Sequence, residues 1–313
     1  MILTITLNPT VDVDFIVNNL QPGGQYRTLP SRRSPGGSGI NVSVTLRRLG
    51  ISSIAMGFLA GFNGAYLLDE LRREKISTHF VHTTGETRIN VCIIDPDTTQ
   101  NSITHLHERG TEIPEADKNT FLKNYERILK RIDKIFIGGS LPPGIDASIY
   151  PLLMRIAKEN SIPVVLHPKG DNLDGVLEEV PNVVKLDYRL SPSCMDVLQD
   201  EIDTFMEKAS ELHRRGTEWV LMSFGKEKVA FSTEKGAWMA EGSAEEMVYL
   251  HASEDALLAG MLAAMEKKRA SPEEIVRLAM ACNWECALHP EKFPQDRACV
   301  DALTPRVLIT KIE

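Results

Sequence analysis

The chain has 313 residues, and its 43 acidic residues outnumber the 35 basic ones, which gives a formal net charge of −8. With 42% hydrophobic and 25% charged residues it is a folded globular chain, so the composition excludes a disordered or fibrous protein. The acidic balance argues against non-specific binding to nucleic acid or to an anionic membrane. No apolar run approaches the roughly 20 residues that span a bilayer. The start, Met1–Leu7, lacks the basic region of a signal peptide, so we expect a cytoplasmic protein.

Short apolar segments alternate along the chain with longer segments of helical spacing. The first read as buried strands: Ile2–Leu7, Ile51–Phe58, Lys134–Ile137, Ile162–Leu166, Val183–Leu186 and Trp219–Ser223. The second read as helices: Ile40–Leu49, Ala65–Glu74, Asp117–Arg131, Ile149–Asn160 and Asp203–Arg215. This alternation predicts an α/β fold with a mostly parallel sheet and helices on both faces. In such folds ligands bind beyond the carboxyl ends of the strands.

Two stretches alternate apolar and polar residues around turn signals instead. They are Asp12–Val17 with Gln25–Leu29, and Arg88–Ile94 with Ser102–His107. We expect antiparallel strands added to the main sheet as a small, half-covered lid. No linker or repeat is visible, so we expect one domain over residues 1–313, with lid strands from about residues 11–33 and 87–107.

The five cysteines do not form a metal-binding pattern. They are Cys92, Cys194, Cys282, Cys286 and Cys299. Cys282 and Cys286 share a helix face, but no nearby His or Cys completes a ligand set. We expect buried, reduced thiols.

Three segments place chemically useful groups next to predicted elements. Pro35–Val42 carries three glycines and leads into a helix, which suits either an anion site or a plain tight turn. Ile137–Gly144 follows a strand and would hold Ser140 in a rigid crevice, unless it is a simple turn. Arg88 on a lid strand could make a bidentate phosphate contact or be an ordinary surface arginine.

The segment Ser253–Met265 is apolar nearly all round and predicts a buried helix. Ser253 can serve as its N-cap, and Glu254 and Asp255 complement the helix dipole. Capping alone explains these residues. A preceding strand, Met247–Leu250, would nevertheless deliver Asp255 to the same sheet edge as the glycine-rich segment.

Taken in order, these segments resemble the ribokinase-like phosphofructokinase-B sugar kinases, in the branch of 1-phosphofructokinase and tagatose-6-phosphate kinase. The matching motifs are Thr4–Asp12, Gly36–Val42, Thr87–Asn90, Gly139–Gly144 and Asp255–Gly260, so the resemblance covers almost the whole chain. It implies a three-layer α/β/α sandwich with a β-sheet lid, which often clasps a homodimer. The implied ligand is a small phosphosugar.

The resemblance also implies roles for individual residues on the substrate side. Asp12, Gly37 and Asn41 would bind sugar hydroxyls, and Arg88 and Ser140 would hold the phosphate that the substrate already carries. Ser38, which belongs to the same implied substrate site, stands where this branch often has lysine, and that change would weaken the attraction for phosphate.

On the nucleotide side the chain departs from the family. The family's Gly-Ala-Gly-Asp corresponds to Ala252, Ser253, Glu254 and Asp255. Asp255 remains as the implied catalytic base, whereas Glu254 adds a carboxylate where the γ-phosphate should approach. Two negative groups about 4 Å apart repel by about 4 kcal/mol at an effective dielectric constant of 20. One oxyanion-hole donor supplies about 3–4 kcal/mol, so the cost is of catalytic size.

Further nucleotide motifs are altered as well. The implied nucleotide-binding residues are Lys185, Asp187, Ser223, Gly225, Ala252, Ser253 and Glu254. The motif that organises Mg²⁺ keeps an oxygen ligand in Asp187 but ends in Leu190, which cannot bind metal. The family's Asp-x-Ser-Gly is His167–Gly170 here. Lys226 or Lys228 could contact phosphates or simply be solvated, and Trp284 could fill the adenine pocket.

Three functions therefore remain open. The first is an ATP- and Mg²⁺-dependent kinase that phosphorylates a hydroxyl of a ketohexose phosphate, of the fructose 1-phosphate or tagatose 6-phosphate type, with Asp255 as general base. The second is a catalytically impaired relative that binds a sugar phosphate as a sensor or as a partner subunit. The third is a kinase that uses a different phosphoryl donor. All three require the residue Asn41 to face Asp255 across one cleft.

Overall fold

The structure is a computed structural model of the chain. It describes residues 1–28, 32–95, 102–169, 173–186, 199–225, 227–243, 245–247, 250, 252–267, 269–289 and 291–312. In these ranges no helix combines the length and the apolar character that crossing a membrane requires.

The main sheet contains eleven strands within the described ranges. In chain order they are β1 (Ile2–Thr6), β4 (Ser53–Ala60), β5 (Ser77–Thr78), β6 (Val81–Thr83), β9 (Lys134–Gly139), β10 (Val164–Pro168), β11 (Val183–Leu186), β12 (Trp219–Phe224), β13 (Lys228–Thr233), β14 (Gly236–Glu241) and β15 (Leu308–Ile312). The spatial order is β15-β14-β13-β12-β11-β10-β9-β1-β4-β5, with β6 paired to β4. The strands from β4 across to β12 run parallel, as the sequence predicted.

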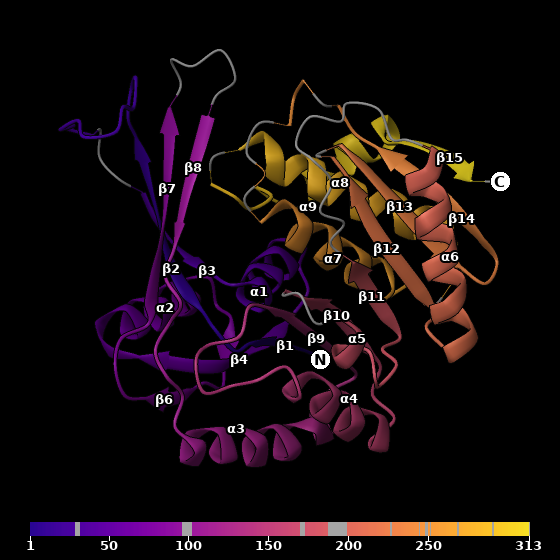
Figure 1. The fold of residues 1–313 in the computed structure, drawn as a ribbon. Helices are drawn as coiled ribbons and strands as arrows, with labels where there is room; N and C mark the ends of the chain where they lie inside the picture. Colours follow the sequence, from indigo (N-terminus) through magenta and orange to yellow (C-terminus); the bar gives the residue numbers. More distant parts are fainter. Residues whose placement is uncertain are drawn as a thin grey trace.

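Helices cover both faces of this sheet, which confirms the predicted layers (Figure 1). On one face lie α1 (Ser38–Arg48), α2 (Gly61–Arg73), α7 (Ser253–Ala264), α8 (Pro272–Leu288) and α9 (Arg297–Leu303). On the other lie α3 (Glu115–Ile128), α4 (Ile149–Glu159), α5 (Leu173–Val176) and α6 (Gln199–Arg215). The short 3₁₀ segments are η1 (Leu129–Arg131) and η2 (Thr304–Arg306). In β1, Ile2 packs toward the first layer and Leu3 toward the second, because successive strand residues point to opposite faces.

A separate four-stranded sheet forms the lid. Its order is β3 (Arg32–Gly36), β2 (Thr10–Ile16), β7 (Arg88–Asp95) and β8 (Ser102–His107). The hairpin β7–β8 is antiparallel as predicted, and β2 pairs with β7 in parallel. In Figure 1 these strands rise above the main sheet rather than extending it. The expectation that they would be added to the main sheet was therefore wrong.

The partner of β2 also differs from the prediction. Residues 25–28 form no strand, Leu29 lies outside the described residues, and β3 begins only at Arg32. The register Thr10↔Gly36 and Asp14↔Arg32 carries the glycine-rich segment into the lid sheet itself. This pairing brings the end of the lid strand directly to the start of α1.

Two further parts of the main sheet were not predicted correctly. Strands β13, β14 and β15 add an antiparallel edge that the alternation of strands and helices did not indicate. Conversely, Met247 and Leu250 are not strand residues, and the two residues between them lie outside the described ranges. Asp255 therefore reaches the carboxyl edge of the sheet through the position of α7 alone.

Candidate active site

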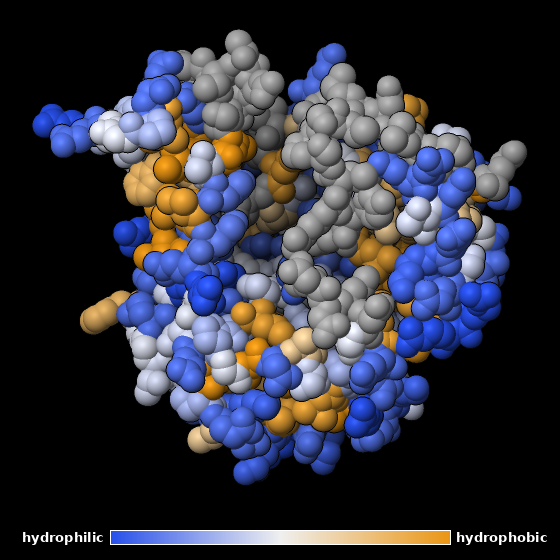
Figure 2. Space-filling model, viewed as in Figure 1, coloured by the Kyte–Doolittle hydropathy of each residue, from blue (hydrophilic) through white to orange (hydrophobic). Residues whose placement is uncertain are grey.

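A cavity of about 930 Å³ lies between the lid sheet and the carboxyl ends of the main-sheet strands. Figure 2 shows a hollow near the middle of the molecule, between the lid and the rest of the chain. Residues predicted from the sequence line it on two sides. From the lid, α1 and the segment after β9 come Asp12, Gly37, Ser38, Asn41, Arg88 and Ser140. From the α7 side come Ser223, Gly225, Ala252, Ser253, Glu254 and Asp255.

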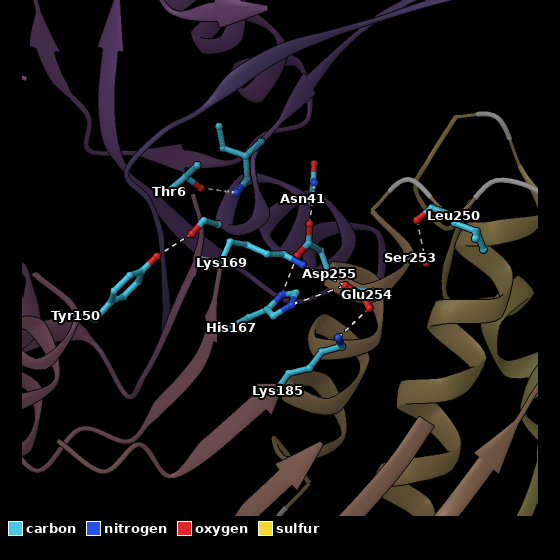
Figure 3. A network of polar contacts seen from close by, with 12 residues as sticks. Thr6, Asn41, Tyr150, His167, Lys169, Lys185, Leu250, Ser253, Glu254 and Asp255 are labelled. Atoms are coloured by element: carbon cyan, nitrogen blue, oxygen red, sulfur yellow. Dashed lines mark hydrogen bonds and ion pairs between the residues drawn. The ribbon is translucent and has the colours of Figure 1, made fainter. Parts of the chain in front are cut away.

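The start of α1 brings the two sides together. Gly37 precedes the helix with φ 104°, a left-handed conformation that favours glycine, and a Cβ there would approach the Thr6 side chain to 2.5 Å. One turn later, Asn41 Nδ2 donates a hydrogen bond to Asp255 Oδ2 at 2.8 Å (Figure 3). The predicted glycine-rich segment and the predicted buried helix therefore face one another across one cleft.

Asp255 is a buried carboxylate of the cavity, and its side chain is 10% exposed. Burial alone would raise the pKa of Asp255, but the neighbouring His167, the hydrogen bond from Asn41 and the charge of Lys169 outweigh it. The net result is a pKa below the ordinary aspartate value. His167 Nδ1 lies 3.6 Å from Asp255 Oδ1, which is the distance of an ion pair rather than of a short hydrogen bond. Asp255 is thus held as an ionised carboxylate.

The turn before α7 keeps a glycine-like backbone without glycine. Ala252 precedes the helix with φ 66° and ψ 3°, and the left-handed conformation costs an L-residue roughly 1–2 kcal/mol. Ser253 is the first helical residue, and its Oγ donates to Leu250 O at 3.0 Å. The prediction that Ser253 is the N-cap was therefore wrong: Ala252 holds that position, and no side chain caps the helix. The first-turn N–H groups of the helix point toward the cavity end, where anions are favoured.

Glu254 belongs to a cluster of charged side chains at the start of α7. Its carboxylate accepts from Lys185 Nζ at 2.8 Å and from Lys169 Nζ at 3.3 Å, and His167 Nε2 lies 3.7 Å away (Figure 3). The Lys185 side chain is fully buried, whereas Glu254 and Lys169 are about one third exposed. The expected repulsion of an incoming phosphate by Glu254 is thus offset by two ammonium groups.

Arg88 is fixed at the base of the lid by main-chain oxygens. Its Nη1 donates to Glu108 O at 2.9 Å and its Nη2 to Asn8 O at 3.0 Å. Asn8 Nδ2 in turn donates to Ser140 Oγ at 3.2 Å. Burial lowers the pKa of Arg88, although Asp12 and Glu108 raise it in part. The Nε atom has no hydrogen-bond partner among the described residues, so the guanidinium still has a donor to offer.

Asp12 carries the second buried carboxylate of the cavity. Its Oδ1 accepts from Asn90 Nδ2 at 3.2 Å, and its Oδ2 forms an ion pair with Lys292. Nearby, burial raises the pKa of Cys92 to about 12, with Asp14 and Asp12 adding to the rise and Lys292 opposing it. The Cys92 thiol is therefore neutral, as expected for a buried reduced cysteine.

The remaining nucleotide-side predictions have mixed outcomes. Asp187, Leu190 and Lys226 lie outside the described residues. Lys185 does not line the cavity but contacts it through Glu254. Lys228 is a residue of β13 that faces Glu241 at 3.8 Å, away from the cavity lining.

The position of Trp284 differs from the predicted one. Its indole is buried in the core, packs near Gly242 and lies under the Arg306 guanidinium, so it does not line the cavity. The preceding residue, Asn283, does line it. Asn283 Oδ1 and Ser223 Oγ are buried and have no hydrogen-bond partner among the described residues. Two polar atoms with unmet hydrogen-bonding capacity thus stand on the wall where the nucleotide was expected.

Within the described residues, no group of three or more His, Cys, Asp or Glu side chains could hold a metal ion. The buried cysteines Cys282 and Cys286 accordingly form no metal site. Burial raises the pKa of both thiols, so they remain protonated.

Sequence reasoning missed several residues that the fold brings into the cavity. They are Asn8, Asn90, His105, His107, Asn283 and Lys292. His167 and Lys169, which also line it, lie in the recognised segment His167–Gly170, but no role was predicted for them from the sequence. Asn8 and Asn90 lie inside motifs that were recognised, so they could have been proposed. Lys292 had no local signal, because it follows α8 in a stretch without a motif and meets Asp12 only in the folded chain.

The chain is similar to known proteins over its whole length. The chain is 28% identical over 312 residues to a 1-phosphofructokinase of Bacillus subtilis (strain 168), with both proteins covered in full. A solved structure described as a possible 1-phosphofructokinase from Thermotoga maritima matches all of both chains with a TM-score of 0.90 and 30% identity. A ribokinase of Arabidopsis thaliana, complexed with ribose and ATP, matches 97% of this chain and 98% of its own with a TM-score of 0.72 and 18% identity, which supports the ribokinase-like fold.

The family model of the pfkB carbohydrate kinases matches residues 9–287. That range begins just before the lid strand with Asp12 and ends within α8, so of the residues that line the cavity it leaves out only Asn8 and Lys292. The resemblance that the motifs indicated is thereby confirmed, and the chain belongs to the pfkB family of carbohydrate kinases.

Proposed function

We propose that the protein is a kinase that transfers the γ-phosphate of ATP to a hydroxyl of a ketohexose phosphate, of the fructose 1-phosphate or tagatose 6-phosphate type. The observation that carries the proposal is the hydrogen bond between Asn41 and the ionised Asp255, in one cavity with the group Arg88, Asn8 and Ser140. The full-length similarity to a 1-phosphofructokinase supports the choice of substrate class.

The lid side of the cavity suits a sugar that already carries a phosphate. Arg88 offers a charged donor that two carbonyl oxygens hold in place, and Ser140 offers a hydroxyl beside it. Asp12 and Asn41 line the same cavity and add polar groups that suit sugar hydroxyls. A ketohexose phosphate would then lie with its phosphate at Arg88 and its free hydroxyl at Asp255.

Asp255 supports the transfer by accepting the proton of the attacking hydroxyl. Its lowered pKa keeps it ionised at neutral pH, and Asn41 fixes the direction of its carboxylate. A positioned general base contributes about 10²–10⁴-fold to a rate. The first-turn N–H groups of α7 lie next to this carboxylate and favour the negative charge that spreads over a phosphoryl group in transfer.

The opposite wall has features that suit a nucleotide. Ser223 Oγ and Asn283 Oδ1 are buried there without hydrogen-bond partners among the described residues. Ala252, in the left-handed conformation, directly precedes α7. When bound, ATP would supply the phosphoryl group. Of the residues that the family resemblance assigns to Mg²⁺, Asp187 has the right ligand chemistry.

A second function is favoured by the cluster at Glu254. Its carboxylate stands at the start of α7 and is held there by Lys185 and Lys169, where a phosphate would otherwise be expected to bind. A chain with this cluster could bind the sugar phosphate without transferring phosphate, and act as a sensor or as a partner subunit. A different phosphoryl donor is the third possibility.

We also propose that the lid mediates a homodimer. Ile16 and Leu106 are large apolar side chains exposed on lid strands, by 41% and 55%. A related structure is described as a tetrameric form of Escherichia coli phosphofructokinase-2. Sedimentation should give a dimer for the native chain and a monomer for Leu106→Asp. A native monomer would contradict the proposal.

The kinase proposal is tested by two measurements on the native protein. Calorimetry determines whether fructose 1-phosphate, tagatose 6-phosphate and ATP–Mg²⁺ bind, and a coupled assay follows ADP release with each sugar phosphate. Turnover with either sugar supports the kinase. Sugar binding without ATP binding or turnover supports the sensor, and turnover only with another nucleotide or with pyrophosphate supports the third function.

A further inference from the structure

Lys292 is a buried lysine in the wall of the cavity. It is 3% exposed, lines the same cavity as Asp255, and adopts a left-handed backbone conformation with φ 54°. A lysine is rarely buried unless it is paired, and a non-glycine residue rarely adopts positive φ. Strain of this kind concentrates at functional sites, so both features indicate that the fold holds this ammonium where it is needed.

The loop at residues 291–296 fixes Lys292 from three directions. Gln295 N donates to both carboxylate oxygens of Glu285, at 3.2 and 3.1 Å, and Cys286 Sγ donates to Lys292 O at 3.0 Å. Arg48 Nη1 of α1 donates to Pro294 O at 3.0 Å. The loop is thus tied to α8 and to α1. Toward the lid it contributes the side chain of Lys292 in the cavity wall, and Glu291, which is half-exposed, pairs with Arg32 of β3 at 3.0 Å.

Across the cavity, Lys292 meets the carboxylate of Asp12 in the lid strand β2. The two side chains are 4% and 3% exposed, so their charges compensate each other almost without solvent. Asn90 Nδ2 holds the other carboxylate oxygen, and a Cβ at Gly36 would collide with the group. The orientation of Asp12 is therefore set by the Lys292 ammonium and the Asn90 amide, and the lack of a side chain at Gly36 leaves room for it.

The charge of Asp12 also depends on Lys292. Burying a carboxylate without a cation favours its protonated form. An ionised carboxylate only accepts hydrogen bonds, whereas a protonated one also donates. Asp14 and the neutral thiol of Cys92 stand beside Asp12 and supply no positive charge. Arg88 adds a Coulombic attraction to Asp12, but its Nη groups donate to main-chain oxygens, whereas Lys292 pairs directly with the carboxylate.

We propose that Lys292 is a positioning residue for the sugar phosphate: it keeps Asp12 ionised and oriented so that Asp12 accepts hydrogen bonds from the sugar hydroxyls. This inference rests on the proposed function, because it requires a polyhydroxylated substrate in the lid side of the cavity. It also makes Lys292 a buried link between the body of the molecule and the lid strand that carries Asp12.

The test measures, by calorimetry, the Kd for fructose 1-phosphate and for tagatose 6-phosphate. The variants are Lys292→Met, Lys292→Arg, Asp12→Asn and the double variant Asp12→Asn/Lys292→Met. Lys292→Met should raise the sugar phosphate Kd by at least about 10-fold, which corresponds to the loss of one hydrogen bond to a charged group. Lys292→Arg should restore binding to within about 3-fold, because it keeps the charge. In any turnover assay, KM should follow Kd while kcat changes by less than about 3-fold.

The double variant separates a role through Asp12 from a direct one. Asp12→Asn/Lys292→Met removes both buried charges and should fold even if Lys292→Met does not. Its Kd should equal that of Asp12→Asn within about 3-fold, because Lys292 then has no carboxylate to position. A further loss of about 10-fold would overturn the proposal and indicate direct contact with the substrate.

A matched control is Lys134→Met, which removes the lysine of an ion pair with Glu266 at the amino end of β9. It should leave the sugar phosphate Kd unchanged. If Lys292→Met lowers the melting temperature but binds the sugar phosphate as the native protein does, the role of Lys292 is structural only and the proposal fails. If the native protein binds neither sugar phosphate, the proposed function fails and this inference fails with it.

Discussion

The two walls of the cavity differ in how they preserve the family pattern. On the lid side, the predicted residues Asp12, Asn41 and Arg88 match the family motifs, and each is held by a specific partner. At the start of α7, alanine and glutamate stand at positions 252 and 254, where the resemblance implies glycine. The left-handed turn at Ala252 nevertheless persists. The left-handed backbone at the start of α7 is thus kept without glycine, whereas the Glu254 carboxylate changes the charge of the site.

The largest expected effect tests whether the α7 wall is still catalytic. Asp255→Asn keeps the size of the side chain but removes the base, so turnover should fall by about 10²–10⁴-fold. The sugar phosphate Kd should change by less than about 3-fold, as measured by calorimetry. Asp301→Asn on α9, whose carboxylate pairs with Arg297, is the control. Retained turnover in Asp255→Asn would show that another group takes the proton.

The next effect tests the lid wall. Arg88→Ala should weaken binding of the sugar phosphate by about 10–100-fold, because hydrogen bonds to charged groups contribute about 1.5–3 kcal/mol. Binding of the unphosphorylated sugar should be affected far less, and Arg88→Lys should recover part of the loss. An equal loss for both sugars would mean that Arg88 serves only to bind Asn8 O and Glu108 O.

A smaller effect is expected from placing glycine next to Asp255, the proposed base. Glu254→Gly should tighten ATP binding by about 5–10-fold, since it removes a carboxylate and leaves Lys185 and Lys169 near the start of α7. Glu254→Gln serves as the control that removes charge while keeping volume. Calorimetry that finds unchanged affinity in both variants would show that the carboxylate does not obstruct the nucleotide.

The smallest effect concerns pH. Because the folded protein lowers the pKa of Asp255, this interaction stabilises the fold above the ordinary aspartate pKa and is lost as pH falls through the lower folded value. His167→Gln removes part of the cause, so the acid limb of kcat/KM should move upward by less than about one pH unit. The fall of the melting temperature in acid should accordingly begin at a higher pH than in the native protein. In an Asp255→Asn background the substitution should have no such effect on the melting profile.

Regular elements were predictable where local pattern and tertiary structure agree. The strand at Ile2 and the helix that ends near Arg48 show the periodicity of a buried strand and of an amphipathic helix, and both formed as expected. The lid strand Arg32–Gly36 could not be recognised, because proline, glycine and charged residues carry no strand pattern. It forms because β2 offers an edge to pair with.

The candidate site was predictable to the extent that single motifs carry it. Asn41 and Asp255 each lie in a recognisable segment. Both segments were expected at the carboxyl edge of the parallel sheet, so the two side chains were expected to lie close together. The cluster around Glu254 was not predictable, because the burial of Lys185 depends on how β11 packs beneath α7. For the same reason a substitution that seemed to repel phosphate in the sequence is compensated in the folded protein.

The pair of Asp12 and Lys292 has a consequence for how the protein is made. The two residues are 280 positions apart, so Asp12 leaves the ribosome long before Lys292, which neutralises its charge. Until the loop after α8 has emerged and docked, Asp12 must stay hydrated or take up a proton. The sugar-binding wall, although it begins at the first strands of the chain, can therefore be completed only among the last steps of folding.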